Sequence, residues 1–267
     1  MNIGRYVEKY SEDLRFKNYS DNTIKNYCSQ VELFLKYFND SVTKPSEIQE
    51  RRIKKYIMLA KTLNSRKHRI SAIKLFYSLT GKQPLKFRNI EYPRPERHLP
   101  QVIDSEFLLH QISTIKNLKH KAIIMLAYSV GLRVSEVVNL KIKDIDSARM
   151  LIAVRQSKGK KDRLLPLSKN VLNVFRLYYK KEKPKVYLFN GQSQLKYSAT
   201  SCNQIVKQYL GSKYHFHLLR HSSFTKMLEN GTDLRIIQKI AGHKSSRTTE
   251  IYTHVSTHLL HQVDLPI

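Results

Sequence analysis

Side chains that could carry out phosphate chemistry gather near the end of this 267-residue chain. His217, Arg220 and His221 are three and four residues apart, so on a helix they would share one face. His243 and Tyr252 follow, the tyrosine on the last turns of a further expected helix. A cationic pocket that also holds a hydroxyl nucleophile suits attack on the phosphorus of a phosphodiester. The spacing therefore indicates that an arginine, histidines and a tyrosine could converge on one pocket.

Each residue type would have its own task in such a pocket. A phenol titrates near pH ~10, so a tyrosine needs help from its neighbours to act as a nucleophile at neutral pH. Arginine donates two hydrogen bonds from a planar fork and places positive charge where the transition state is most negative. Because such cations supply the charge, no metal ion and no other cofactor is expected. Tyr252 is one of 16 tyrosines, however, and filling the hydrophobic core is the alternative role for any single one.

Arg133 is a second candidate for binding an anion. It follows Gly131 at the start of an expected helix, where backbone N–H groups and the helix dipole favour negative charge. The alternative is an ordinary salt bridge between Arg133 and Glu136, three residues later.

Lys158 is a third candidate cation. It lies in the stretch 157–162, which is expected to join two short strands at 150–154 and 163–167 as a hairpin. Lysines in turns are usually solvated. Three lysines around a flexible glycine can also reach into a bent phosphate backbone, so both roles stay open.

The composition restricts the class of partner. Lys and Arg number 48 against 21 acidic residues, and the resulting net charge of +27 indicates a polyanion, most often nucleic acid. Both halves contribute, because residues 1–97 hold 21 basic and 10 acidic side chains (+11) and residues 98–267 hold 27 and 11 (+16). A membrane surface is the competing partner, but no segment approaches the roughly 18 uninterrupted apolar residues of a spanning helix. With two cysteines, Cys28 and Cys202, and no apolar signal-peptide core, we expect a reducing cytoplasm.

The apolar pattern predicts two domains and a linker. Residues 1–80 follow a helical period throughout. Residues 81–100 contain four prolines, which cannot continue a helix, and so predict an extended interdomain linker. Residues 101–267 would form the second domain, with helices around the hairpin. Helices are expected at 3–14, 24–38, 46–60, 65–79, 104–112, 118–130, 171–179, 199–210, 217–230, 234–240 and 246–254.

At this point the residues resemble a known family, the tyrosine site-specific recombinases of the phage-integrase and Xer type. Five motifs carry the resemblance in the family's order, and together they make it very specific. They are residues 131–136, the Lys158 hairpin, His217-x-x-Arg220-His221, the stretch 227–235 that continues through Gly242-His243-Lys244, and the stretch 248–255 around Tyr252. The N-terminal part resembles the family's helical core-binding domain in length and pattern, and residues 23–27 are its most typical piece.

The resemblance implies a role for each main residue. Tyr252 would attack the scissile phosphate to give a 3′-phosphotyrosyl link and a free 5′-hydroxyl. Arg133 and Arg220 would hold the non-bridging oxygens, and Lys158 would protonate the leaving 5′-oxygen. His217 would serve as acid and base for the tyrosine.

Supporting roles are implied for the neighbouring residues. His243 would donate a hydrogen bond to the phosphate, although it could instead stabilise a helix junction. Glu136 resembles the acidic residue that supports the cationic cluster in this family. His221 and His254 are expected to be structural or supporting.

The family's fold is mainly α with a small β-sheet (α+β), and the resemblance implies a C-shaped clamp around DNA. Its parts would be an N-terminal helical core-binding domain (1–80), a linker (81–100) and a mixed catalytic domain with a C-terminal tail (101–267). The tail, residues 256–267, would pack on a neighbouring protomer or fold back on its own domain.

The implied function is a site-specific DNA recombinase that works through the 3′-phosphotyrosine intermediate and a Holliday junction, in integration, excision or resolution. Its partners would be double-stranded DNA with a specific core site, three further copies in a homotetramer on DNA, and accessory recombination proteins. Two alternatives are a type IB-like DNA topoisomerase and a non-catalytic DNA-binding protein of the same fold.

Overall fold

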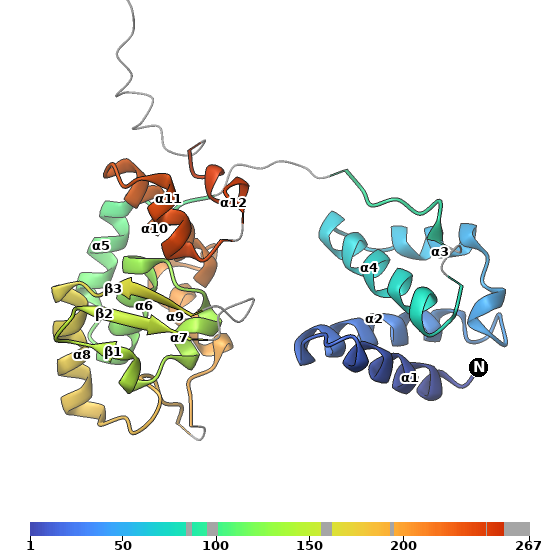
Figure 1. Ribbon diagram of the computed structural model, residues 1–267, viewed down its shortest axis with the longest axis horizontal. Helices are drawn as coiled ribbons and strands as arrows, with labels where there is room; N and C mark the ends of the chain where they lie inside the picture. Colours follow the sequence, from blue (N-terminus) through green and yellow to red (C-terminus); the bar gives the residue numbers. More distant parts are fainter. Residues whose placement is uncertain (84–86, 95–100, 156–161, 193–194, 244, 254–267) are drawn as a thin grey trace, which may run out of the picture. The chain divides into compact units, whose positions relative to one another are not determined.

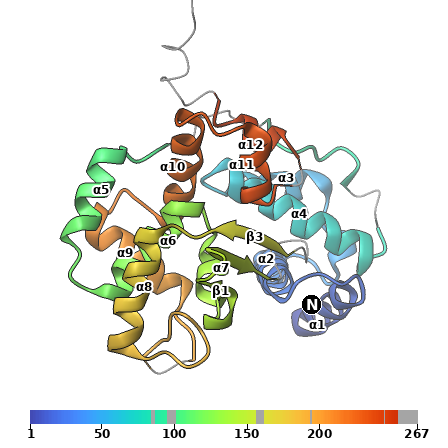
Figure 2. The same cartoon turned by 60° about the vertical axis from the view of Figure 1, so that its left-hand side comes forward.

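The computed structural model describes residues 1–83, 87–94, 101–155, 162–192, 195–243 and 245–253. In these ranges the chain is mainly helical with one small sheet, which confirms the expected α+β class (Figures 1 and 2). Its internal contacts divide it into two compact units, Met1–Arg97 and His98–Ile267. Among the described residues, no helix combines the length and hydrophobicity needed to cross a membrane.

The N-terminal unit is a set of helices around an aromatic core. Its elements are α1 (Ile3–Phe16), α2 (Asp21–Phe38), the 3-10 helix η1 (Pro45–Glu47), α3 (Glu50–Met58) and α4 (Leu63–Leu79). Ser20 caps the start of α2, because its hydroxyl accepts a hydrogen bond from the Thr23 N–H at 3.3 Å.

Two expectations for the N-terminal unit are corrected by its packing. The single helix expected at 46–60 is split into η1 and α3, because the fully buried Ile48 adopts an extended backbone between them. Phe87 and Ile90, inside the expected linker 81–100, are 1 % and 5 % exposed and pack in the core of this unit. The ordered N-terminal unit therefore extends beyond residue 80.

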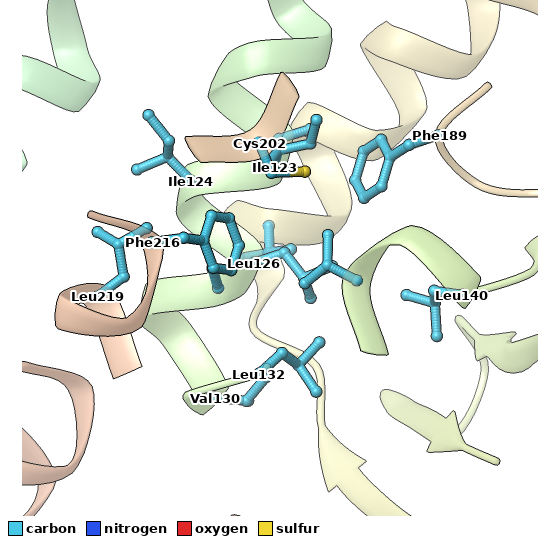
Figure 3. Packing of buried hydrophobic residues seen from close by; sticks show 14 of the residues in the cluster. Ile123, Ile124, Leu126, Val130, Leu132, Leu140, Phe189, Cys202, Phe216 and Leu219 are labelled. Atoms are coloured by element: carbon cyan, nitrogen blue, oxygen red, sulfur yellow. The ribbon is translucent and has the colours of Figure 1, made fainter. Parts of the chain in front are cut away.

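The C-terminal unit surrounds helix α6 with helices and a small sheet. Its first elements are α5 (Ser105–Thr114), α6 (Leu118–Val130), α7 (Val134–Asn139) and η3 (Ile142–Asp144). The later helices are α8 (Lys169–Glu182), α9 (Ala199–Leu210), α10 (Phe216–Glu229), α11 (Leu234–Ala241) and α12 (Arg247–Glu250). Figure 3 shows Ile123 and Leu126 of α6 packed with Phe216 and Leu219 of α10. Since α6 carries apolar residues on all sides, it is buried in the middle of the unit.

The sheet has three antiparallel strands, β1 (Ile145–Asp146), β2 (Leu151–Val154) and β3 (Arg163–Pro166), in that order. β2 and β3 are the two strands expected from the sequence, each slightly shorter, and β1 was not expected. In the register, Val154 lies opposite Arg163 and Leu151 opposite Pro166. Pro166 is tolerated because β3 is at the edge of the sheet.

The last expected helix, 246–254, is much shorter in the structure. α12 is a single turn, and tight hydrogen bonds from the N–H of Tyr252 to the carbonyl of Thr249 and from Thr253 to Glu250 continue it only as turns. This geometry turns the Tyr252 ring into a small core with Phe224 and Ile237. His254 lies outside the described residues.

Candidate active site

The ends of three helices place the candidate residues. α6 ends at Gly131, which has a left-handed backbone (φ +62°), and Arg133 is the cap residue that begins α7. A side chain at 131 is excluded, because a Cβ there would lie 2.4 Å from Cε1 of Phe224. α10 carries His217, Arg220 and His221 on its first two turns, as the spacing predicted.

Arg220 is buried and held by main-chain carbonyls. Its side chain is 1 % exposed; Nη1 donates to the carbonyl of Gly131, and Nη2 donates to the carbonyl of Ala241 at 2.7 Å. The guanidinium also lies over the Phe224 ring, 4.6 Å from its centroid. Burial, followed by the charge of Arg133, lowers the pKa of Arg220 to about 10, so it stays charged at neutral pH.

His243 completes the surroundings of Arg220 as a neutral ring. Its Nε2 is 3.1 Å from Arg220 Nη2, and because arginine can only donate, Nε2 must accept. The proton is therefore assigned to Nδ1, which donates to Thr249 Oγ1 at 2.9 Å. Burial and the charge of Arg220 lower the pKa of His243 to about 4, in agreement with a neutral ring.

Arg133 makes the salt bridge that was its alternative interpretation. Its Nη1 donates to Glu136 Oε1 and its backbone N–H to Oε2, both at 2.9 Å. The Glu136 side chain is 4 % exposed, whereas that of Arg133 is 22 % exposed. Burial alone would raise the pKa of Glu136, but hydrogen bonds and charge from Arg163, and then from Arg133, lower it below the ordinary value. The carboxylate is thus ionised and supports the arginine, and the arginine keeps an open side.

The candidate nucleophile lies in the same cluster. Tyr252 is 1 % exposed, its ring meets Phe224 edge-on at 5.5 Å between centroids, and its hydroxyl is 3.2 Å from Nδ1 of His221. Burial raises the pKa of Tyr252, while the charges of Arg220 and Arg133 oppose that rise. The two arginines therefore favour the phenolate that attack requires.

His221, which was expected to be structural or supporting, contacts the Tyr252 hydroxyl directly. It makes the described hydrogen bond to Tyr252, whereas His217 is exposed and stacks edge-on against His221 at 4.6 Å between ring centroids. Burial and the neighbouring His217 lower the pKa of His221 to about 4.

Arg163, at the start of β3, was missed by sequence reasoning. Its Nη1 and Nη2 donate to the two oxygens of Glu136, both at 2.9 Å, and its Nε donates to the carbonyl of Ile240 at 2.8 Å. No spacing in the sequence links position 163 to either partner, because both contacts are made across the fold.

The structure brings together most of the expected site. Arg220 contacts His243 directly and shares the Phe224 ring with Tyr252, which contacts His221, and His217 is at the edge. Arg133 joins this group less directly, through Glu136 and Arg163, which binds the end of α11 beside the carbonyl that holds Arg220. Lys158 lies outside the described residues. Among the residues that the structure describes, no group of three or more His, Cys, Asp or Glu side chains is placed to hold a metal ion.

Comparison with known proteins covers nearly the whole chain. Residues 103–258 match the phage integrase family, and residues 6–86 match the phage integrase N-terminal SAM-like domain. A putative integrase/recombinase of Sinorhizobium fredii is 32 % identical, over 94 % of this chain and 84 % of that protein. The tyrosine recombinase XerA of Pyrococcus horikoshii is also 32 % identical, over 94 % of this chain and 89 % of that protein.

Solved structures agree with this comparison. The crystal structure of a XerA recombinase is 28 % identical, with a TM-score of 0.56 over 99 % of this chain and 100 % of that one. A XerH recombinase in a post-cleavage complex with its difH DNA has a TM-score of 0.75 at 21 % identity, over 92 % of this chain and 80 % of that one. At that level of identity, the second likeness shows the fold alone.

Proposed function

Because the chain belongs to the phage integrase family, as a tyrosine site-specific recombinase that cleaves and rejoins DNA, we propose that Tyr252 is its nucleophile. The observation that carries this proposal is the position of the Tyr252 hydroxyl in one buried cluster with Arg220 and His221. The topoisomerase and non-catalytic alternatives are not favoured by the relatives.

In the proposed reaction, Oη of Tyr252 forms a bond to phosphorus as the bond from phosphorus to the 5′-oxygen breaks. The phenolic proton passes to the histidine pair, since His221 touches the hydroxyl and the exposed His217 is next to it. The 5′-oxygen takes its proton from Lys158. The phosphodiester energy is kept in the 3′-phosphotyrosyl bond, so rejoining needs no ATP.

The arginines would stabilise the charge that develops on the non-bridging oxygens. Among the described residues, the Nε–H and the second Nη1–H of Arg220 have no protein partner, so a phosphate could accept from both. Arg133 would donate from its exposed side. His243, a neutral ring whose Nε2 already accepts from Arg220, would have to release that contact before it could hydrogen-bond to the phosphate.

The test is covalent trapping on a nicked DNA substrate, from which the fragment next to the cleavage site is lost after attack. Wild type should accumulate a protein–DNA adduct and Tyr252→Phe should not. Tyr178→Phe is the matched control, because it also removes a buried hydroxyl with a hydrogen bond, here to Asn190 at 3.1 Å. An adduct that persists in Tyr252→Phe, or no adduct with wild type on its cognate site, would contradict the proposal.

The proposal extends to assembly. Exchange between two DNA duplexes breaks four strands, so four copies of Tyr252 are needed, and we infer a homotetramer on two core sites. Mass photometry of Tyr252→Phe with site DNA should show four chains per two duplexes. A complex that stops at two chains would contradict this. The assignment of DNA binding to the N-terminal unit, the clamp around DNA, the cytoplasmic location and the accessory proteins stay predictions.

A further inference from the structure

We propose that Arg163 is a positioning residue for DNA cleavage, which holds Glu136 so that Arg133 can serve the scissile phosphate. This inference depends on the proposed function, in which Arg133 binds that phosphate. It concerns a residue that no motif of the sequence singled out.

Arg163 is held by contacts with two other elements of the fold. Its guanidinium contacts both oxygens of Glu136 in a two-pronged pair at 2.9 Å, and Nε reaches the carbonyl of Ile240 at 2.8 Å. The side chains of Arg163 and Glu136 are 10 % and 4 % exposed. One side chain therefore connects β3, α7 and the end of α11. Because the pair is buried and two-pronged, it should hold these elements more firmly than an exposed ion pair would.

The Glu136 carboxylate is shared between two arginines. Oε1 accepts from Nη1 of Arg133 and Nη1 of Arg163, and Oε2 accepts from the Arg133 backbone and Nη2 of Arg163. Without Arg163, a single arginine would neutralise the buried carboxylate, and Arg133 would be drawn to it. With Arg163 in place, one positive charge of the trio remains for the phosphate.

The last two residues of α11, just before the turn at Gly242, are each held by an arginine. The carbonyl of Ile240 accepts from Arg163, and the next carbonyl, at Ala241, accepts from Arg220. Gly242 then passes closely over Arg163, since a Cβ there would lie 3.4 Å from Nη1. The turn leads into His243, so Arg163 aligns both the Arg133 side and the Arg220 side of the site.

The test uses full-length protein and saturating nicked substrate, with DNA affinity measured separately. Arg163→Gln should lower the single-turnover cleavage rate on the order of 100-fold, as expected when a catalytic group is misplaced. Arg163→Lys should restore little, because lysine keeps the charge and loses the planar fork. Arg155→Gln is the matched control: it removes the pair between Arg155, which follows β2, and Asp144 of η3 at 2.8 Å, and it should change the rate no more than a few-fold.

Two measurements separate positioning from a merely structural role. In a Glu136→Gln background, Arg163→Gln should cost much less than it does in wild type, because the pair with Glu136 is already broken and only the contact to Ile240 remains to be lost. On a substrate with a methylphosphonate at the cleavage site, which lacks one anionic oxygen, the loss caused by Arg163→Gln should shrink, since the demand for Arg133 is smaller. A general loss of folding would lower cleavage of both substrates equally.

Several results would overturn the inference. They are additive losses with Glu136→Gln, equal losses on both substrates, and a loss confined to DNA affinity, which would make Arg163 a DNA contact. Wild type, Arg163→Gln, Glu136→Gln and the double variant also give a readout that does not depend on activity. If the pair exists, the two substitutions should lower the unfolding midpoint by less together than the sum of their separate effects. If wild type traps adduct and Arg163→Gln matches it, this inference alone fails; if wild type traps none, the proposed function fails.

Discussion

At the scale of single residues, the site depends on how a buried guanidinium is satisfied. Arg220 is enclosed by the carbonyls of Gly131 and Ala241, the ring of Phe224 and the accepting nitrogen of His243. A buried charge needs such partners, because each unpaired polar group in the interior costs free energy. The two carbonyls are at the ends of α6 and α11. Gly131, which provides one of them, has a left-handed backbone and lies against the Phe224 ring, so its position is tightly constrained.

Replacing Gly131 should therefore be costly. Gly131→Ala should lower the free energy of unfolding by about 2–5 kcal/mol, because a left-handed alanine costs about 1–2 kcal/mol and the clash with Phe224 adds about 1–3 kcal/mol. Gly231→Ala is the control with a left-handed backbone (φ +79°) and no atom within 4 Å, so only the strain of about 1–2 kcal/mol applies. Denaturant unfolding measures both, and equal losses would contradict the packing at Gly131.

The histidines predict how stability depends on pH. The folded protein lowers the pKa of His221 and His243 to about 4, so an unfolded chain, with histidines near 6.5, binds more protons as the pH falls. Stability should be complete above about pH 6.5 and should decline toward pH 4, by less than about 1.4 kcal/mol per pH unit for each ring, because both rings are only half-buried.

Thermal unfolding between pH 8 and pH 5 checks this decline, above the range in which the Glu136 carboxylate titrates. His243→Gln should make the melting temperature less dependent on pH, and replacing the exposed His110 by Gln should leave the dependence as it is. A wild-type melting temperature that is constant over this range would show that the rings are not held neutral.

At the scale of elements, short helices and their ends position the chemistry. α7 begins at Arg133, and α10 carries Arg220 and His221. The end of α11 supplies two carbonyls, and the turn after it leads to His243. α11 is only eight residues long, so its cap matters more than it would in a long helix. Asp233 caps it by accepting from the N–H groups of Arg235 and Ile236 at 2.8 and 3.3 Å.

Removing this cap should affect both stability and cleavage. Asp233→Ala should cost about 1 kcal/mol of folding free energy and should also slow single-turnover cleavage, because α11 holds the carbonyls that accept from Arg163 and Arg220. Ser168→Ala removes the corresponding cap of the longer helix α8, at 3.2 Å from the Val171 N–H, and should cost up to about 1 kcal/mol of stability with unchanged cleavage. If the two variants slowed cleavage alike, the end of α11 would have no special role.

Most elements and most of the site could be predicted from local signals. α6 and α9 have the bounds expected for them, because apolar runs and glycine ends mark them in the sequence. β1 was missed because two residues carry no periodicity. The partners of Arg163, and the contact between His221 and Tyr252, could not be predicted, since they join positions far apart in the chain.

At the scale of the whole molecule, charge is the dominant property. The chain carries +27, and both of its compact units are basic. Even the buried acidic side chain of Glu136 is paired with two arginines, so that cluster keeps a net positive charge. Binding by such a protein is driven by the release of counterions from the phosphates. Added salt makes this release less favourable and so weakens binding.

Affinity for cognate DNA should therefore fall steeply with salt. If each chain neutralises about 6–10 phosphates, affinity should drop by about 10³–10⁵ between 50 and 200 mM salt. Fluorescence anisotropy with Tyr252→Phe, which cannot cleave, measures this slope for binding alone. A slope near zero would contradict a DNA interface built on the basic surface.

The most direct measurement is to identify the amino acid that joins DNA in the trapped adduct. Wild-type protein is reacted with the nicked substrate, the adduct is digested, and the DNA-linked peptide is sequenced by mass spectrometry. The DNA should be attached through its 3′-phosphate to the peptide that contains Tyr252. Attachment through a 5′-phosphate, or to any other of the 16 tyrosines, would contradict the central claim that folding places this phenol beside Arg220 for attack on the scissile phosphate.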